Sequence, residues 1–423
     1  MKHSSSLSFT GLTSWFLCAI FFMYEFLIRT VIGTFECAIT QDLDLTIVQF
    51  SILSSSAYLL VYGLMQLPVG NLCDKYGIKI NLSIASLLCA LSIMGFSFCH
   101  NFYSALTFRL LMGLGSSFGF VCLLVAVYEY LPKRYSGLFI GVSQFIGTMG
   151  PLIAAGPLNS LSDSSHTDWR TIFMILGFAG LILLVLIQGI LKKHIPSLIF
   201  KQKNTDNFSK KVQQLLQHSQ VWLIALFSGS VYFTIEYLSE NSGKTYLMLH
   251  GYNSNISSYL ISIAWAGYAI GCPLLGLTSD MTLKRKPMMM LSSILCLVAI
   301  ILIVYFPINT SMLAISFFML GLGASGQNIG FAIMAEQCSS KNLALGLGFN
   351  NAIIFLIGAI NAPLISWTLT RLSPIKAPTI IHYHQAFLII ISALMITTYL
   401  SSRYIKETFC KKKLKALNRN ATL

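Results

Sequence analysis

Twelve hydrophobic segments along the chain are long enough to cross a lipid bilayer as helices. Such a helix needs about 20 mostly apolar residues to span a hydrocarbon core of about 30 Å. We predict six spans in the first half, at residues 11–35, 47–67, 78–98, 103–128, 136–158 and 170–190. We predict six more in the second half, at residues 221–238, 257–277, 287–306, 312–334, 345–369 and 385–404. The pattern therefore indicates an all-α membrane protein with two pseudo-symmetric six-helix bundles.

The composition agrees with a chain whose solvent is mostly lipid. Of its 423 residues, 55% are hydrophobic and 10% are charged, which is unlike a water-soluble domain. The first span is too long for a signal-peptide core and lacks a small-residue cleavage site, so we expect it to be retained. Despite the net charge of +14, we expect no nucleic-acid partner, because the basic residues form short clusters between hydrophobic runs.

The distribution of basic residues predicts the orientation of the spans. If the loops alternate sides, 22 of the 28 Lys and Arg residues lie on the side of the termini and four on the opposite side. Loops rich in Lys and Arg stay in the cytoplasm. We therefore expect a multi-pass protein of the bacterial inner membrane with both termini cytoplasmic.

The long basic connection between the sixth and seventh spans predicts the domain organisation. We expect an N-terminal bundle at residues 1–190, a linker at 191–220, a C-terminal bundle at 221–404 and a basic tail at 405–423. Residues 209–220 place their apolar side chains below the lysines on one helical face. This part of the linker is either a helix lying on an anionic membrane surface or a solvated connection.

The two halves repeat each other at an offset of about 207 residues. The corresponding segments are 70–74 with 276–280, 113–115 with 321–323, and 143–144 with 350–351. Two similar bundles can rock about a site between them, which is what alternating-access transport requires.

Three segments resemble motifs of the major facilitator superfamily. Residues 70–79 look like its signature loop between the second and third helices. Residues 129–137 look like its loop between the fourth and fifth helices, and residues 109–115 resemble its fourth-helix Arg/Gly motif. The resemblance implies two six-helix bundles, a small-molecule substrate and a monomeric transporter in the lipid bilayer.

A finer resemblance concerns residues 24–29 and 62–70, which look like the phagosomal amino-acid and metabolite transporters of intracellular proteobacteria. Similar branches of the superfamily carry nucleosides or polycarboxylate iron chelators. The Gly/Pro motif of the antiporters is matched only in part by residues 147–157, so drug antiport is not favoured.

Ionisable residues within the predicted spans are the first candidates for function, because a charge in hydrocarbon is costly unless it is paired or hydrated. Glu25 lies near the middle of the first span, and Arg29 follows one turn later. One interpretation makes Glu25 a proton carrier and Arg29 an anchor for an anionic substrate group. The other is a structural ion pair along one helix. Arg109 is the alternative partner of Glu25, and the sequence leaves that choice open.

On the seventh span, Glu236 is either a second proton-coupling site or an interfacial carboxylate in water, and we expect Glu240 to be solvated. Amides at membrane depth are candidates to bind substrate or to hold helices together. The predicted substrate-binding residues are Tyr24, Arg29, Arg109, Gln327, Asn328, Asn350 and Asn351; the proton-coupling residues are Glu25 and Glu236; the gating residues are Gly70, Asp74, Lys75, Gly276 and Asp280.

The residues favour proton-coupled uptake of a small amino acid or organic anion. The alternative within the fold is export of an organic anion, a polycarboxylate siderophore or a drug by proton antiport. An enzyme is not expected, since the chain has no nucleophile elbow, HExxH motif or glycine-rich phosphate loop. A sensor that has lost transport is a further alternative. No metal or organic cofactor is expected.

Overall fold

The computed structural model describes residues 8–132, 136–191, 213–306, 309–338, 343–373 and 377–409. Regular secondary structure in these residues is helical, and twelve helices are long and apolar enough to cross a membrane. The predicted all-α fold with twelve spans is confirmed. Residues 192–212 of the linker and the tail from residue 410 lie outside the described residues, so the domain boundaries and the in-plane helix stay predictions.

Some spans are single long helices and others consist of two or more consecutive shorter helices. The first half contains α1 (Phe9–Thr34), α2 (Glu36–Asp42), α3 (Ile47–Ser51), the π-helix η1 (Ile52–Ser56), α4 (Ala57–Ser97), α5 (Phe102–Ser116), α6 (Phe118–Tyr130), α7 (Ser136–Ser165) and α8 (Trp169–Ile190). The second half contains α10 (Ser219–Glu240), α11 (Gly243–Leu249), α12 (Ser254–Thr282), α13 (Lys286–Tyr305), α14 (Thr310–Ala324), α15 (Gln327–Gln337), α16 (Leu343–Leu372) and α17 (Ile380–Arg403).

The sequence repeat has a structural counterpart where the fourth and tenth spans begin. The side chain of Asn101 accepts a hydrogen bond from the backbone of Ser104 and caps α5. Asn309 caps α14 in the same way through the backbone of Met312. Side-chain acceptors at this position satisfy amide groups that have no partner within the helix. The two halves therefore begin corresponding helices with the same local chemistry.

The predicted loop between the second and third spans is largely helical, which differs from our expectation. α4 continues through residues 67–76, and the chain turns at Gly77, where φ is +76° and ψ is 170°. That region of φ favours glycine because it has no Cβ. The second span, Ile47–Gln66, therefore continues as a helix beyond its apolar part, and the glycine turn lies near the start of the third span, Lys75–Ser97.

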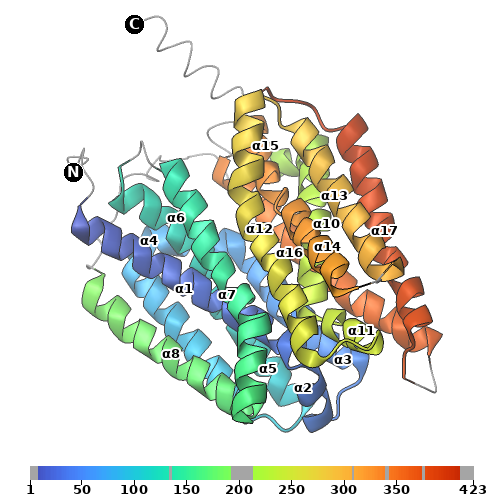
Figure 1. Cartoon of the computed structure of the whole chain (residues 1–423). Coiled ribbons are helices and arrows are strands. Elements are labelled where there is room, and N and C mark those ends of the chain that lie inside the picture. The colour runs from blue at the N-terminus through green and yellow to red at the C-terminus, as the bar shows by residue number, and fades with distance from the viewer. Residues whose placement is uncertain are drawn as a thin grey trace, which may run out of the picture.

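Helices of each half pack mainly against helices of the same half. α1 lies beside α7, and α4 lies beside α5 and α8, while α12 lies beside α14 and α13 beside α17. The halves meet where α7 packs against α12 and α4 against α16, and α1 also reaches α10. Figure 1 shows the first half in blue and green and the second in yellow to red, with α2, α3 and α11 at the lower end.

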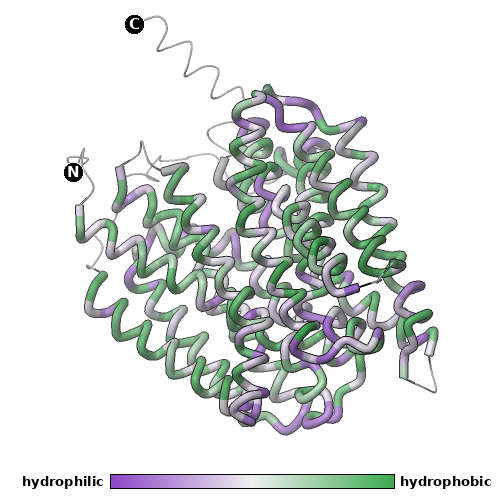
Figure 2. The backbone as a smooth tube through the Cα atoms, viewed as in Figure 1, coloured by the Kyte–Doolittle hydropathy of each residue, from purple (hydrophilic) through white to green (hydrophobic). Residues whose placement is uncertain are grey.

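The hydropathy of the chain follows this arrangement. Figure 2 shows hydrophobic residues along the lengths of the helices, and many of the hydrophilic ones near the helix ends and connections. Large apolar side chains such as Ile182, Val185 and Ile315 are exposed on the outer faces of long helices. A surface of this kind fits lipid rather than water, and the protein is a multi-pass membrane protein.

Candidate functional site

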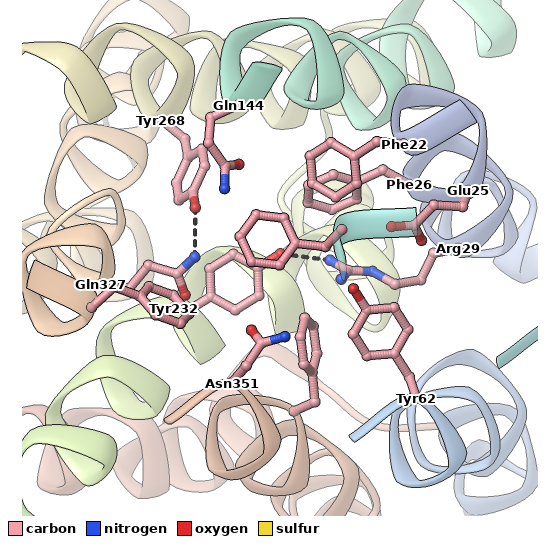
Figure 3. Close-up of a pocket in the computed structure, with 13 residues that line it drawn as sticks. Phe22, Glu25, Phe26, Arg29, Tyr62, Gln144, Tyr232, Tyr268, Gln327 and Asn351 are labelled. Atoms are coloured by element: carbon pink, nitrogen blue, oxygen red, sulfur yellow. Dashed lines mark hydrogen bonds between the residues drawn. The ribbon is translucent and has the colours of Figure 1, made fainter. Parts of the chain in front are cut away.

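A pocket lies between the two halves and is lined by residues of α1, α4, α6, α7, α10, α12, α15 and α16 (Figure 3). Its empty volume is about 380 Å³, counting the part that opens to solvent. The charged and amide residues of the lining are Glu25, Arg29, Gln144, Gln327 and Asn351. The aromatic residues are Phe22, Phe26, Tyr62, Phe120, Tyr232, Tyr268, Phe331 and Phe355. The pocket thus combines one cation with a largely aromatic wall.

Arg29 joins the two halves at the edge of this pocket. It is only 2% exposed, and its Nε donates to Glu240 Oε1 at 2.8 Å while its Nη2 donates to the Tyr232 hydroxyl at 2.7 Å. The guanidinium also lies over the Phe26 ring at 4.3 Å. Both hydrogen-bond partners belong to α10, so Arg29 connects α1 to the opposite half through a buried ion pair.

Glu240 corrects two expectations from the sequence. We expected it to be solvated, but it is 0% exposed. It lies at the end of α10, where α1 packs closely enough that a methyl group on Gly33 would collide with its backbone. It also takes the role of ion-pair partner for Arg29 that we had considered for Glu25 along one helix.

Glu25 faces the same pocket but is held by a neutral group. The Tyr58 hydroxyl donates to its Oε2 at 3.0 Å, and the Tyr58 ring stacks on Tyr62 with centroids 6.0 Å apart. The ion pairs found among the described residues do not include Glu25. The carboxyl is therefore buried without a direct cationic partner in that part of the chain.

Arg109 does not line the pocket, although it was a predicted substrate-binding residue. Its guanidinium donates to the carbonyl oxygens of Leu53 and Ser54, both at 2.8 Å. Longer bonds of 3.3 Å reach the carbonyls of Ile28 and Arg29. These four acceptors belong to the first half, so the hydrogen bonds of Arg109 hold α5 against α1 and η1.

Glu236 is buried one turn before Glu240 on α10 and is 1% exposed. Neither of its carboxyl oxygens has a hydrogen-bond partner among the described residues. The carboxyl lies against Gly358 of α16, outside the pocket lining. Asn350, also predicted to bind substrate, is buried with both amide atoms unpartnered in the same described part of the chain.

The other predicted binding residues divide into two groups. Gln327 and Asn351 line the pocket, and each donates to a neighbouring side chain: Gln327 to the Tyr268 hydroxyl at 2.6 Å and Asn351 to Gln66 at 2.8 Å. Asn328 instead donates to Cys272 Sγ at 3.0 Å. Tyr24 points toward Gly180 of α8. Of these four predicted substrate-binding residues, only Gln327 and Asn351 therefore line the pocket.

Sequence reasoning missed Gln144 and most of the aromatic lining. For Gln144 a signal existed, because the repeat aligns residues 143–144 with 350–351. Gln144 and Asn351 occupy corresponding places in the two halves, and both line the pocket. The aromatic residues carried no such signal, since rings at helical spacing are equally typical of bundle cores and lipid contacts.

Polar contacts close the interface at the end that holds α2, α3 and α11. Asn241 bonds the hydroxyls of Ser54 and Ser55 at 2.7 and 2.8 Å. Lys244 donates to the Thr34 carbonyl at 2.8 Å and to Asn159 at 2.6 Å. These contacts link first-half residues to the segment that follows α10. We call this end of the interface the closed end.

Glu36 belongs to the closed end and lies outside the spans. The Thr245 hydroxyl donates to Glu36 Oε2 at 2.5 Å across the interface. Burial of the carboxyl raises its pKa from the ordinary 4.5 to about 7, while the Thr245 hydrogen bond and nearby Lys244 act in the opposite direction. Burial also lowers the pKa of Lys244. Glu36 is therefore a group whose charge changes near neutral pH.

At the opposite end, glycines face open space. A methyl group on Gly70 or Gly276 would meet no atom within 4 Å. Lys75 is exposed, with its ammonium 5.0 Å from the Tyr76 ring centroid. Asp280 bonds Arg285 at 2.7 Å within the second half. The side chain of Asp74 lies outside the described residues, and the gating role of this set stays a prediction.

Known proteins share this architecture. The model of the Major Facilitator Superfamily matches residues 16–281 and 244–419. The niacin transporter NiaP of Acinetobacter baylyi is 30% identical over 155 residues, which are 37% of this chain and 34% of that protein. A phosphoglycerate transporter protein of Salmonella typhimurium is 25% identical over 308 residues, 66% of this chain and 65% of that protein. The chain thus spans less than two thirds of the length of these curated relatives.

The solved structures give a longer match. A bacterial homolog of the human lysosomal transporter Spinster, in an inward-facing and unoccupied conformation, superposes with a TM-score of 0.77. Its sequence is 16% identical, and the match covers 96% of this chain and 99% of that one. At this level of identity the likeness concerns the fold.

Proposed function

The chain belongs to the Major Facilitator Superfamily, and we propose that it carries a small organic carboxylate across the bacterial inner membrane by alternating access. The observation that carries the proposal is Arg29, a buried cation that lines the pocket and ties it to both halves. An arginine can hold a carboxylate through two parallel hydrogen bonds. The transported compounds named for the relatives, niacin and phosphoglycerate, are both carboxylates.

In this proposal the substrate competes with Glu240 for Arg29. The guanidinium already binds one carboxylate oxygen of Glu240 across the interface. A substrate carboxylate that takes over this hydrogen bond removes the ion pair between α1 and α10 and leaves only the bond from Arg29 to the Tyr232 hydroxyl. Binding at the pocket is then coupled to loosening of the closed end, because a ligand shifts a conformational equilibrium only through contacts that differ between the states.

The two ends of the interface suggest which state the molecule occupies. The closed end contains the bonds of Asn241, Lys244 and Thr245, whereas a methyl group on Gly70 or Gly276 at the other end would meet no atom within 4 Å. From the distribution of Lys and Arg we expect the end that holds Gly70 and Gly276 to be cytoplasmic. We therefore propose that this is the inward-facing state and that both termini are cytoplasmic.

Protons are the proposed coupling ions, and Glu25 and Glu236 are the proposed carriers. Both carboxyls are buried, and an ionised carboxylate in such a place is costly without a close counter-ion. We propose that each is protonated in this state. Loss of a proton from Glu25 would place a second negative charge near Arg29, which links the proton to the Arg29–Glu240 pair.

Transport in proteoliposomes tests the proposal, with labelled nicotinate and 3-phosphoglycerate as probes. We expect counterflow of at least one probe, and accumulation of that probe when the lumen is more alkaline than the medium. Glu25→Gln should keep counterflow and lose accumulation. Accumulation when the lumen is instead more acidic than the medium would indicate export by antiport. The absence of Arg29-dependent exchange for every carboxylate tested would contradict the proposed function.

A further inference from the structure

We propose that the carboxylate taken by this pocket is aromatic and carries a hydrogen-bond donor at the end of the ring remote from the carboxylate. This inference deepens the proposed function and rests on it. It depends on three features of the pocket: the cation at one side, the rings in the middle and an unpartnered acceptor at the far side.

The cation is already placed against rings. Arg29 lies 4.3 Å from the Phe26 centroid and 5.5 Å from that of Phe355. Phe355 in turn meets Tyr62 edge to face, with centroids 4.4 Å apart. A carboxylate bound to Arg29 therefore has aromatic faces and edges directly beside it. A flat ring attached to that carboxylate can continue the edge-to-face pattern that aromatic groups prefer.

The rings of the middle section come from both halves of the protein. Phe120 of α6 and Phe331 of α15 approach across the interface, with centroids 6.4 Å apart. Tyr232 and Tyr268 form another pair, within the second half, with ring centroids 5.9 Å apart. A ligand ring packed beside these pairs would make contacts of the same aromatic kind. A flexible polyhydroxy acid would bring hydroxyl groups that the aromatic wall cannot satisfy.

The far side of the pocket presents an acceptor. Gln327 donates through Nε2 to Tyr268, and its Oε1 is buried with no partner among the described residues. Figure 3 shows Gln327 and Tyr268 on the side of the pocket opposite Arg29 and Glu25. A buried oxygen without a partner costs free energy that a ligand donor can recover. A hydroxyl or amino group on the ring, far from the carboxylate, fits this place.

The position of Glu25 is compatible with two kinds of aromatic carboxylate, an aromatic amino acid and a simple aromatic acid. It lies on the same side of the pocket as Arg29 (Figure 3). An ammonium group next to the substrate carboxylate could reach it, as in an aromatic amino acid. A simple aromatic acid has no ammonium group, so Glu25 would bind only the coupling proton. Both compounds share the ring, the carboxylate and the remote donor, which are the features that the pocket selects.

Matched ligands test the inference on the unmodified full-length protein. The probes are 3-phenylpropionate against 3-cyclohexylpropionate, and L-phenylalanine against L-cyclohexylalanine, with the 4-hydroxyphenyl analogue of each aromatic compound. Binding is measured by calorimetry in detergent. In at least one series we expect the aromatic member to bind about threefold to tenfold more tightly than its saturated partner. The 4-hydroxy analogue should bind more tightly again.

Two variants locate the effects. Gln327→Leu should remove the gain from the hydroxyl while keeping the gain from the ring. Phe331→Leu should reduce the gain from the ring. The matched control is Phe349→Leu. Phe349 lies on α16, whereas Phe331 lies on α15; it packs against Trp222 with ring centroids 4.9 Å apart and is absent from the pocket lining.

The outcomes separate this inference from the function on which it rests. Equal affinity for aromatic and saturated partners in both series would overturn the inference. If 3-phosphoglycerate then binds in an Arg29-dependent manner, carboxylate transport stands and only the aromatic class is wrong. If no carboxylate binds in that manner, the proposed function fails as well.

Discussion

Two buried arginines are direct neighbours, since Arg109 donates to the Arg29 carbonyl at 3.3 Å, and their surroundings differ in kind. Arg109 is satisfied by four backbone carbonyl oxygens of the first half. Arg29 bonds two side chains of the second half, the Glu240 carboxylate and the Tyr232 hydroxyl. Backbone carbonyls are fixed by the helices that hold them, whereas side-chain partners on another half can be exchanged.

The π-helix η1 explains why backbone carbonyl oxygens are available to accept hydrogen bonds from Arg109. Leu53 and Ser54, its two closest acceptors, belong to η1. The wider turn of a π-helix disturbs the regular ladder of backbone hydrogen bonds and leaves carbonyl oxygens available to other donors. Arg109 therefore stabilises an irregular turn, and Arg29 is the arginine that can respond to a ligand. The predictions for Arg29, Arg109 and Glu240 test this distinction.

The largest effect is expected from removing Arg29. Arg29→Ala should abolish carboxylate exchange in proteoliposomes, because no other cation lines the described pocket. The variant also leaves Glu240 buried without its partner, which destabilises the fold. The control is the double variant Arg29→Leu with Glu240→Leu, which removes both charges. It should recover the melting temperature and still fail to exchange, whereas recovered exchange would make Arg29 structural.

Arg109→Lys should act on stability instead of binding. A lysine ammonium cannot reach the carbonyls of Leu53 and Ser54 with the geometry of a guanidinium. Each buried carbonyl left unsatisfied costs about 1 to 3 kcal/mol. We expect a lower melting temperature and an unchanged dissociation constant for the bound carboxylate, both measured on purified protein. A weakened affinity with normal stability would give Arg109 a role in binding.

Glu240→Gln should increase affinity. The neutral amide competes less well for Arg29 than the carboxylate, since hydrogen bonds between charged groups are stronger than neutral ones by about 1 kcal/mol. We expect the carboxylate to bind about fivefold more tightly, as measured by calorimetry. Weaker binding in this variant would mean that Glu240 positions Arg29 for the substrate and does not compete with it.

The smallest effect concerns the pH dependence of the closed end. The pKa of Glu36 is about 7 at the closed interface and should return toward 4.5 when that end opens to water. The closed end then binds this proton more tightly, so its extra stability is complete below about pH 4.5 and is lost as the pH rises through 7. Hydrogen exchange of α2 and α11, corrected for the intrinsic effect of pH on exchange, should therefore become faster as the pH rises. The change should fall between about pH 5 and about pH 8, within one to two units of the Glu36 pKa.

Two variants identify the group responsible. Glu36→Gln should remove this change in exchange and keep the closed end protected at higher pH. Thr245→Val removes the hydrogen bond that lowers the pKa of Glu36, so the change should shift to higher pH. An unaltered pH profile in both variants would assign the effect to another group.

The sequence predicted the fold better than the site, for physical reasons. Span length and hydropathy are local properties, so all twelve spans were found. The partners of charged residues depend on how helices meet. Glu240 was expected to be solvated because it ends a span, but α1 packs against that end and buries it. The place of Gln144 in the pocket could have been predicted from the repeat. The hydrogen-bond partners of Arg109 could not, since its two closest carbonyl acceptors belong to an irregular turn.

The central claim is that Arg29 holds the carboxylate of the substrate, and one binding measurement tests it directly. The affinities of 3-phenylpropionate and of its neutral amide are compared on the unmodified protein, on Arg29→Lys and on Arg109→Lys. Losing one charge-assisted bond costs about 1.5 to 3 kcal/mol, so the preference for the carboxylate should fall roughly tenfold to hundredfold in Arg29→Lys. It should stay unchanged in Arg109→Lys. An equal preference in all three proteins would contradict the account.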